Sequence, residues 1–80
     1  MTTAQIDKLK IFDEVFVKLA GNYYGGIFCG YDWLENKYIV ELKYQICNHM
    51  YMPFSLESNE LVTELYSQEE IESIIGYKLP

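Results

Sequence analysis

The sequence predicts a mainly β fold, a small five-stranded antiparallel barrel followed by a short C-terminal helix. Residues 23–31 combine tyrosine, isoleucine and phenylalanine with glycines, and residues 37–44 alternate apolar with polar side chains. Aromatic and β-branched residues are enriched in strands, and alternation directs one face of a strand toward a core. Residues 67–70, Ser-Gln-Glu-Glu, match a capping box and predict where a helix begins.

The composition predicts one folded domain. The chain has 80 residues, of which 50% are hydrophobic and 16% aromatic, enough for one core but not for two. We expect a single domain over residues 1–80, with a loose or short helical segment at 1–10, a barrel at 11–66 and a helix at 67–76. The first residues lack the pattern of a secretory signal, and no apolar run is long enough to span a membrane. With two cysteines and no export signal, the sequence predicts a cytoplasmic protein with reduced thiols.

The first strand is predicted over residues 12–19, where apolar residues occupy alternate positions. The same region also places apolar residues at helical spacing, which leaves open a helix over residues 4–20 on a three-stranded sheet, an α+β fold of order α-β-β-β-α. We favour the strand because the run Val-Phe-Val lowers helix propensity, and because Gly21-Asn22 suits a hairpin turn.

The second and third strands are predicted over residues 23–31 and 37–44, joined by a polar turn at 34–37. Gly26 and Gly30 lie inside the second strand and indicate bulges or bends that let a small sheet curl. In the third strand, alternation places four apolar side chains on one face. These are Tyr38, Val40, Leu42 and Tyr44.

The rest of the chain predicts two more strands and a helix. A fourth strand ends before Pro53, because proline lacks the N–H that a paired central strand needs. A turn at 55–59 leads into a last strand at 60–66, for which a helix over 57–66 is the alternative. The capping box starts the C-terminal helix at Ser67, and Gly76 ends it.

This order of elements resembles the Src-homology-3-like small barrels, such as the photosystem I accessory barrel and the transcription-associated KOW domains. The resemblance covers residues 12–66 and depends on the strand at 15–17, the glycine-kinked strand at 25–30 and the third strand at 38–42. It implies a strongly bent, five-stranded antiparallel barrel. It implies no particular function, because such barrels bind proteins, nucleic acids or no known ligand.

The net charge of −6 includes six lysines and no arginine. A nucleic-acid-binding domain usually presents clustered lysine and arginine, so direct binding to DNA or RNA is disfavoured, and no membrane partner is expected. The whole net charge lies between residues 55 and 76, as either a solvated face or a surface that attracts a basic partner. The candidate acidic partner-binding residues are Glu57, Glu60, Glu64, Glu69, Glu70 and Glu72.

The aromatic residues exceed what a core of this size can bury. Tyrosine, tryptophan and methionine are enriched at protein interfaces, although tyrosines can also lie flat on a small barrel with the hydroxyl in water. The candidate aromatic partner-binding residues are Tyr23, Tyr24, Tyr31, Trp33 and Tyr51.

No motif in the chain predicts catalysis or a cofactor. Cys29, Cys47 and His49 could supply three metal ligands, but a structural zinc site needs four, usually with a closely spaced cysteine pair. His49 is the only histidine, no nucleophile stands in a recognisable turn, and the glycines form no phosphate-binding loop. We therefore expect no enzyme activity, no metal and no cofactor.

The sequence thus predicts a non-enzymatic protein-interaction module whose protein partner is basic or binds nucleic acid. Small, acidic, aromatic-rich proteins resemble in type the phage and mobile-element inhibitors of host nucleic-acid machinery, including anti-CRISPR and DNA-mimic proteins. That resemblance implies an inhibitor acting in the cytoplasm of a host cell. An accessory subunit that stabilises a larger complex is the main alternative, and a nucleic-acid-binding small barrel is the third. The sequence favours no particular oligomeric state.

Overall fold

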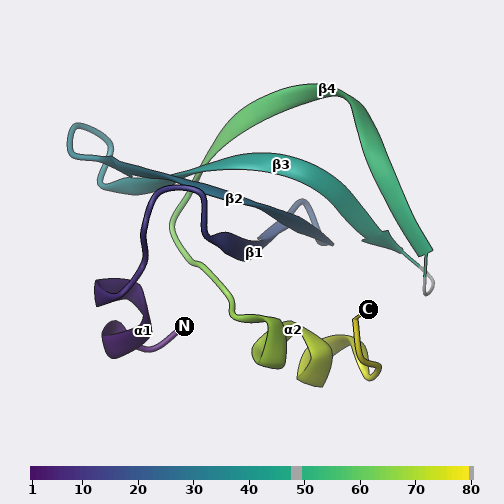
Figure 1. The fold of residues 1–80 in the computed structure, drawn as a ribbon. Coiled ribbons are helices and arrows are strands. Elements are labelled where there is room, and N and C mark those ends of the chain that lie inside the picture. The colour runs from purple at the N-terminus through teal and green to yellow at the C-terminus, as the bar shows by residue number, and fades with distance from the viewer. Residues whose placement is uncertain (48–49, 80) are drawn as a thin grey trace.

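The computed structural model contains a four-stranded antiparallel sheet with a short helix near each end of the chain (Figure 1). It describes the backbone of residues 1–47 and 50–79 and the side chains of residues 1–46 and 59–79. The strands lie in sequence order, and each pairs with the next. The elements are α1 (Thr3–Asp7), β1 (Glu14–Leu19), β2 (Asn22–Asp32), β3 (Lys37–Cys47), β4 (Met50–Val62) and α2 (Gln68–Ile75).

The first predicted strand is confirmed, and the alternative helix over residues 4–20 is wrong. β1 begins at Glu14 rather than at residue 12, because Phe12 has a φ of 83°, outside the β region. The turn that follows β1 consists of Ala20 and Gly21, with φ of 50° and 81°, so the predicted turn at Gly21-Asn22 is wrong by one residue and Asn22 is the first residue of β2. Positive φ at both central residues is the geometry of a type I′ turn, whose twist matches that of the flanking strands.

The predicted kinks in β2 are confirmed as two bulges in its pairing with β3. Beside Gly26, β3 carries Lys43 as an extra residue, and beside Gly30, β2 carries Cys29 as an extra residue. A bulge bends its strand and redirects the side chains beyond it. The sheet therefore curls, as its glycines predicted.

The predicted common face of the third strand is wrong at one residue. Tyr38, Val40 and Leu42 contact the core inside the curled sheet, whereas Tyr44 contacts the core beneath α2. The extra residue Lys43 lies between Leu42 and Tyr44 and reverses the alternation there.

The buried side chains form two clusters, one on each face of β1. Val15 and Val17 are fully buried on one face, and Phe16, with 2% of its surface exposed, is buried on the other. The sheet cluster comprises Val15, Val17, Phe28, Val40, Leu42, Val62 and Leu65. The helix cluster comprises Phe16, Ile46, Ile71 and Leu79.

A single strand, β4, replaces the predicted fourth and fifth strands. It continues through Pro53 and through the predicted turn at 55–59, so both predicted boundaries are wrong. β4 pairs with β3 only, and an edge strand tolerates proline because one side of its backbone faces away from the ladder. A register shift between Leu42 and Tyr44 of β3 accompanies the arch of β4 in Figure 1.

The predicted closed barrel is also wrong, because the sheet stays open between β1 and β4. Within the described residues, β1 and the chain after β4 meet at one bridge, between Phe16 and Tyr66. The Phe16 N–H donates to the Tyr66 carbonyl (3.0 Å), and the Tyr66 N–H donates to the Phe16 carbonyl (2.8 Å). β4 includes residues 60–62, which belong to the predicted fifth strand over residues 60–66. The chain then bends at Thr63, so only Tyr66 returns to β1.

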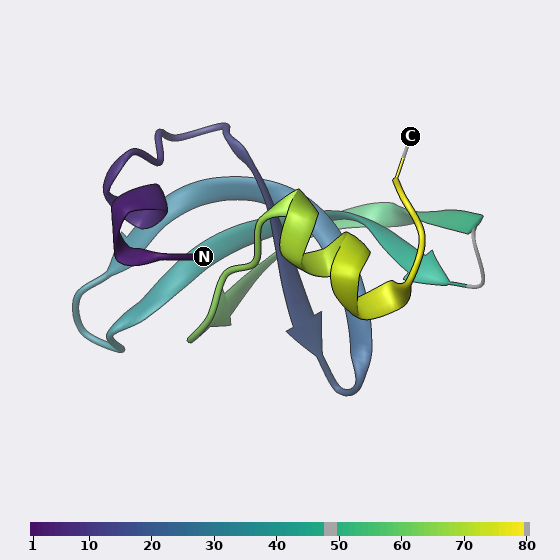
Figure 2. The same cartoon turned by 90° about the horizontal axis from the view of Figure 1, so that it is seen from below.

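The C-terminal helix begins and ends where the sequence predicts. The Ser67 Oγ accepts from the Glu70 N–H (3.2 Å), and the Glu70 carboxylate accepts from the Ser67 N–H (2.8 Å), which completes a capping box. Gly76 ends the helix with a φ of 85°. Figure 2 shows α2 lying across β1, where Ile71 enters the helix cluster.

The short helix α1 starts with a second capping box, between Thr2 and Gln5. The Thr2 hydroxyl accepts from the Gln5 N–H (3.2 Å), and the Gln5 side chain accepts from the Thr2 N–H (2.8 Å). The pattern Thr-x-x-Gln is visible in the sequence and marks a helix start by the same rule as the pattern at Ser67.

Removing either cap of α2 should destabilise the protein. Ser67→Ala deletes an acceptor for a backbone N–H and should cost about 0.5–2 kcal/mol of unfolding free energy. Gly76→Val should cost about 1–2 kcal/mol, because a side chain is disfavoured at positive φ although the space around Gly76 is open. Urea unfolding measures both effects, with Ser73→Ala on the exposed part of α2 as the control. If Ser67→Ala unfolds with the control, the cap does not stabilise the helix.

Candidate functional site

Exposed apolar side chains gather at the end of the sheet where β2 turns into β3. Their exposed fractions run from 40% at Leu61 to 95% at Leu34. Among the described residues, Ile74 on α2 is the one large exposed hydrophobic residue outside this group. We define the apolar end as Ile11, Phe12, Trp33, Leu34 and Leu61.

The turn between β2 and β3 exposes two of these side chains, Trp33 and Leu34, to solvent. The Asp32 carboxylate accepts from the backbone N–H groups of Leu34 (2.9 Å) and Glu35 (3.1 Å), and Asn36 completes the turn with a φ of 56°. Such side-chain bonds to the following backbone order a turn. Trp33 and Leu34 are thus presented on a structured turn rather than on a loose loop.

A row of aromatic rings connects Trp33 to the core. The ring centroids of Trp33 and Tyr31 are 4.8 Å apart, those of Tyr31 and Tyr38 are 5.2 Å apart, and those of Tyr38 and Phe28 are 6.4 Å apart. The first two pairs are edge-to-face, a geometry that stabilises by about 0.5–1.5 kcal/mol per pair. The exposed indole is therefore supported from beneath.

The connection between α1 and β1 adds the other side of the apolar end. The Phe12 N–H donates to a β2 carbonyl (2.9 Å), and the Cδ1 atom of Ile11 lies 3.6 Å from the position that a Cβ of Gly30 would take. Gly30 pairs with Ile39, which pairs with Leu61. Ile11 and Leu61 therefore share one end of the sheet.

Of the four predicted aromatic residues whose side chains are described, the structure brings two together. Tyr31 and Trp33 contact each other, whereas Tyr23 and Tyr24 lie at the other end of β2, beside the turn from β1. Tyr23 packs against the helix cluster and Tyr24 against the sheet cluster. The side chain of Tyr51 lies outside the described residues.

The other four residues of the apolar end were absent from the predicted site, although one of them had a visible signal. Leu34 falls in the predicted turn, where a large apolar side chain has no core to enter. Ile11, Phe12 and Leu61 offered no such signal, because their neighbours at this end of the sheet come from distant parts of the chain.

The structure gives two of the six predicted acidic residues a role inside the fold. The Glu70 carboxylate completes the capping box and pairs with the Met1 ammonium group (2.6 Å). The Glu72 carboxylate accepts from the Leu79 N–H (2.7 Å) and holds the chain after α2. Both carboxylates therefore stabilise the fold.

The remaining acidic residues whose side chains are described lie on the surface. Glu60, Glu64 and Glu69 are exposed, and they come from β4, from the segment after it and from the first turn of α2. The side chain of Glu57 lies outside the described residues.

The Met1–Glu70 pair predicts a pH-dependent part of the stability. The Met1 ammonium, followed by the Ser67 N–H, holds the pKa of Glu70 below its ordinary value of 4.5. Folding therefore favours the charged carboxylate, so this stabilisation is present above about pH 4.5 and is lost as the pH falls through the lowered pKa.

Urea unfolding of the wild type and of Glu70→Gln, from about pH 7 to about pH 3, measures this contribution. Glutamine keeps an acceptor for the capping box and removes the charge. We expect the wild type to be more stable at neutral pH and the difference to close below about pH 4.5. A difference that stays constant over this range would contradict the role of the charge.

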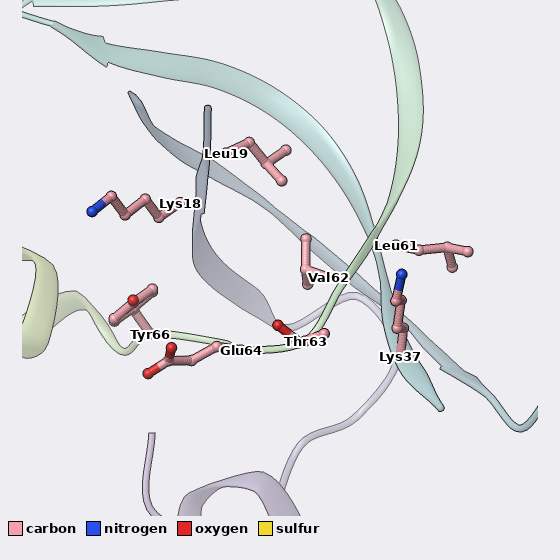
Figure 3. A pocket seen from close by; sticks show the side chains of 8 residues that line it. All are labelled: Lys18, Leu19, Lys37, Leu61, Val62, Thr63, Glu64 and Tyr66. Atoms are coloured by element: carbon pink, nitrogen blue, oxygen red, sulfur yellow. The ribbon is translucent and has the colours of Figure 1, made fainter. Parts of the chain in front are cut away.

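A polar cavity of about 280 Å³ lies between the edge strands β1 and β4 (Figure 3). In Figure 3 the Glu64 carboxylate lies beside the Tyr66 ring, and burial together with Glu64 raises the pKa of the Tyr66 hydroxyl. The lining residues are Lys18, Leu19, Lys37, Leu61, Val62, Thr63, Glu64 and Tyr66.

Within the part of the chain that is described, no three His, Cys, Asp or Glu side chains come close enough to hold a metal ion. Of the three possible ligands in the sequence, Cys29 is half-buried at the second bulge of β2, and the side chains of Cys47 and His49 lie outside the described residues. None of the described helices has the length and apolar character needed to cross a membrane.

Comparisons with protein-family models, with curated proteins and with solved structures found no match to this chain.

Proposed function

We propose that this chain is a non-enzymatic protein-interaction module that binds a protein partner through the apolar end. The observation that carries the proposal is the exposure of Trp33 (82%) and Leu34 (95%) on a turn ordered by Asp32. Neighbouring apolar side chains that are exposed to solvent are typical of interaction surfaces. Tryptophan is enriched among the interface residues that contribute most of the binding energy.

The geometry of the apolar end suits tight binding. Burying one large apolar side chain contributes about 1.5–3 kcal/mol, so Trp33 and Leu34 together can anchor an interface. The contact of Trp33 with Tyr31, which in turn contacts Tyr38, orders the indole before binding. Less conformational entropy is then lost when a partner covers it.

The charge of the chain favours a basic partner. The net charge is −6, and Glu60, Glu64 and Glu69 are exposed. A field of this sign accelerates encounter with a positively charged surface, such as that of a nucleic-acid-binding protein. We infer that the module acts by covering such a surface, as an inhibitor from a phage or mobile element would, with the apolar end supplying most of the affinity.

Affinity capture from cells tests the proposal with three forms of the protein. The wild type and the control variant Ile74→Ser, which removes an exposed apolar side chain from α2, should retain the same partner. Trp33→Ser/Leu34→Ser should lose it. Trp33 is the only tryptophan, so a blue shift of its fluorescence with the purified partner reports burial directly. A partner retained by the double variant, or lost from the control as well, would contradict this surface.

The contribution of the exposed acidic residues to association can be tested separately once the partner is purified. Glu60→Gln/Glu64→Gln/Glu69→Gln should slow association at low salt, and added salt should reduce the difference from wild type. Trp33→Ser should instead act mainly by accelerating dissociation. An unchanged association rate in the triple variant would remove the acidic residues from the mechanism.

A further inference from the structure

The outer edge of β1 has backbone groups that face the gap beside β4. Phe16 directs its N–H and C=O outward to Tyr66. In an antiparallel strand, residues two positions apart direct these groups to the same side, so Lys18 also directs its N–H and C=O outward. In the described part of the chain, no residue forms a hydrogen bond with these two groups of Lys18.

The segment that should lie opposite Lys18 is displaced from it. Continuing the antiparallel bridge of Phe16 and Tyr66 would place Glu64 opposite Lys18. The chain instead bends at Thr63, and the cavity of about 280 Å³ separates the two edges (Figure 3). The cavity thus occupies the place of a missing strand residue.

The cavity has more positive than negative side chains, in a chain whose net charge is negative. Lys18 from β1 and Lys37 from β3 both line it. The Lys18 ammonium lies over the Tyr23 ring, 5.7 Å from its centroid, and neither lysine forms an ion pair with a described residue. The one acidic lining residue, Glu64, lies beside Tyr66. A carboxylate is therefore the charge-complementary occupant, and Leu19 and Val62 supply apolar wall for its methylene groups.

We propose that the gap between β1 and β4 binds an extended peptide segment of a partner protein, antiparallel to β1 and paired with it at Lys18, with an Asp or Glu side chain that the positive charges of Lys18 and Lys37 on the two sides of the cavity attract. Adding a strand to an open sheet edge is a general mode of peptide recognition, in which the backbone gives affinity and one side-chain pocket gives specificity. The site shares Leu61 with the apolar end but does not involve Trp33 or Leu34, and it does not depend on the proposed function.

A peptide titration followed by amide NMR spectroscopy tests the site without a known partner. The probe is a blocked pentapeptide, Thr-Val-Glu-Val-Thr, added to about 5 mM because a single short strand binds weakly. The amides of Lys18 and Thr63 should shift saturably, and exchange of the Lys18 amide with solvent should slow as the peptide binds. Exchange at Val17, whose N–H faces β2, should not change. A peptide with lysine at its centre, or with an N-methylated glutamate, should bind at least fivefold more weakly.

Charge reversal tests the specificity. Lys18→Glu/Lys37→Glu should prefer the lysine-centred peptide, whereas the control Lys10→Glu/Lys78→Glu, with the same net charge but lysines outside the cavity, should keep the wild-type preference. Lys18→Gln/Lys37→Gln should lose the preference for the glutamate peptide and serves if the reversed variant does not fold.

Three outcomes would overturn the site. They are no saturable shift at Lys18 with any peptide, equal binding of the N-methylated peptide, and identical preferences in the cavity and control variants. Trp33→Ser/Leu34→Ser should bind the glutamate peptide as well as wild type does. A result that contradicts binding at the apolar end can therefore be distinguished from one that contradicts peptide binding in the gap.

Discussion

Replacing Phe16 with alanine should cost about 3–5 kcal/mol of unfolding free energy. Only 2% of Phe16 is exposed, and its ring lies in the helix cluster with Ile71 and Leu79. Truncation removes the side chain that joins α2 to the sheet and leaves a cavity that the fixed backbone cannot close. Because a single core of this size supplies roughly 3–5 kcal/mol in total, the variant should be largely unfolded at 25 °C.

Phe12→Ala is the matched control, since it makes the same change at a side chain that is 79% exposed. Its unfolding free energy should lie within about 0.5 kcal/mol of wild type. Urea unfolding followed by circular dichroism measures both variants. Equal destabilisation of the two would mean that Phe16 is not a core residue and would contradict the two-sided burial of β1.

Gly26→Ala should be nearly as damaging, at about 3 kcal/mol, the upper part of the usual range for overpacking. A Cβ on Gly26 would lie 2.5 Å from the carbonyl oxygen of Glu41 and 2.8 Å from the Val40 Cγ1 atom. The oxygen belongs to the backbone of β3, so the strands must move apart at the bulge to admit a methyl group. That movement would weaken the pairing on which the curl of the sheet depends.

Gly25→Ala provides the comparison at the neighbouring position. A Cβ there would meet the far end of the Tyr44 ring, which can turn away, so this variant should lose less stability than Gly26→Ala. Thermal unfolding of the two proteins under one set of conditions gives the order. If Gly25→Ala proved the less stable, contact with the β3 backbone would not be the reason for glycine at position 26.

Part of the candidate site followed from the sequence. A turn after the second strand places Trp33 and Leu34 away from any core, and Trp33 was a predicted partner-binding residue. Phe12 did not follow, because its positive φ accompanies a hydrogen bond to β2, which lies beyond the local sequence. The internal use of Glu70 and Glu72 did not follow either. It depends on where Met1 and Leu79 meet α2.

The sequence by itself determined the elements whose signals lie within a few residues. The capping box at Ser67, the left-handed Gly76, the hairpin after β1 and the bulges near the β2 glycines each depend on backbone conformations that neighbouring side chains select. A local energy preference was sufficient in each of these cases.

Only the tertiary structure decided whether the sheet closes. The outcome depends on whether Thr63–Tyr66 pairs with β1 along its length or at a single residue, and these segments lie at opposite ends of the chain. The long edge strand β4 competes for the same residues, and Pro53 does not stop it because its outer side needs no partner. Which of these two pairings forms depends on the summed energy of many contacts between distant residues, and no short stretch of sequence determines that sum.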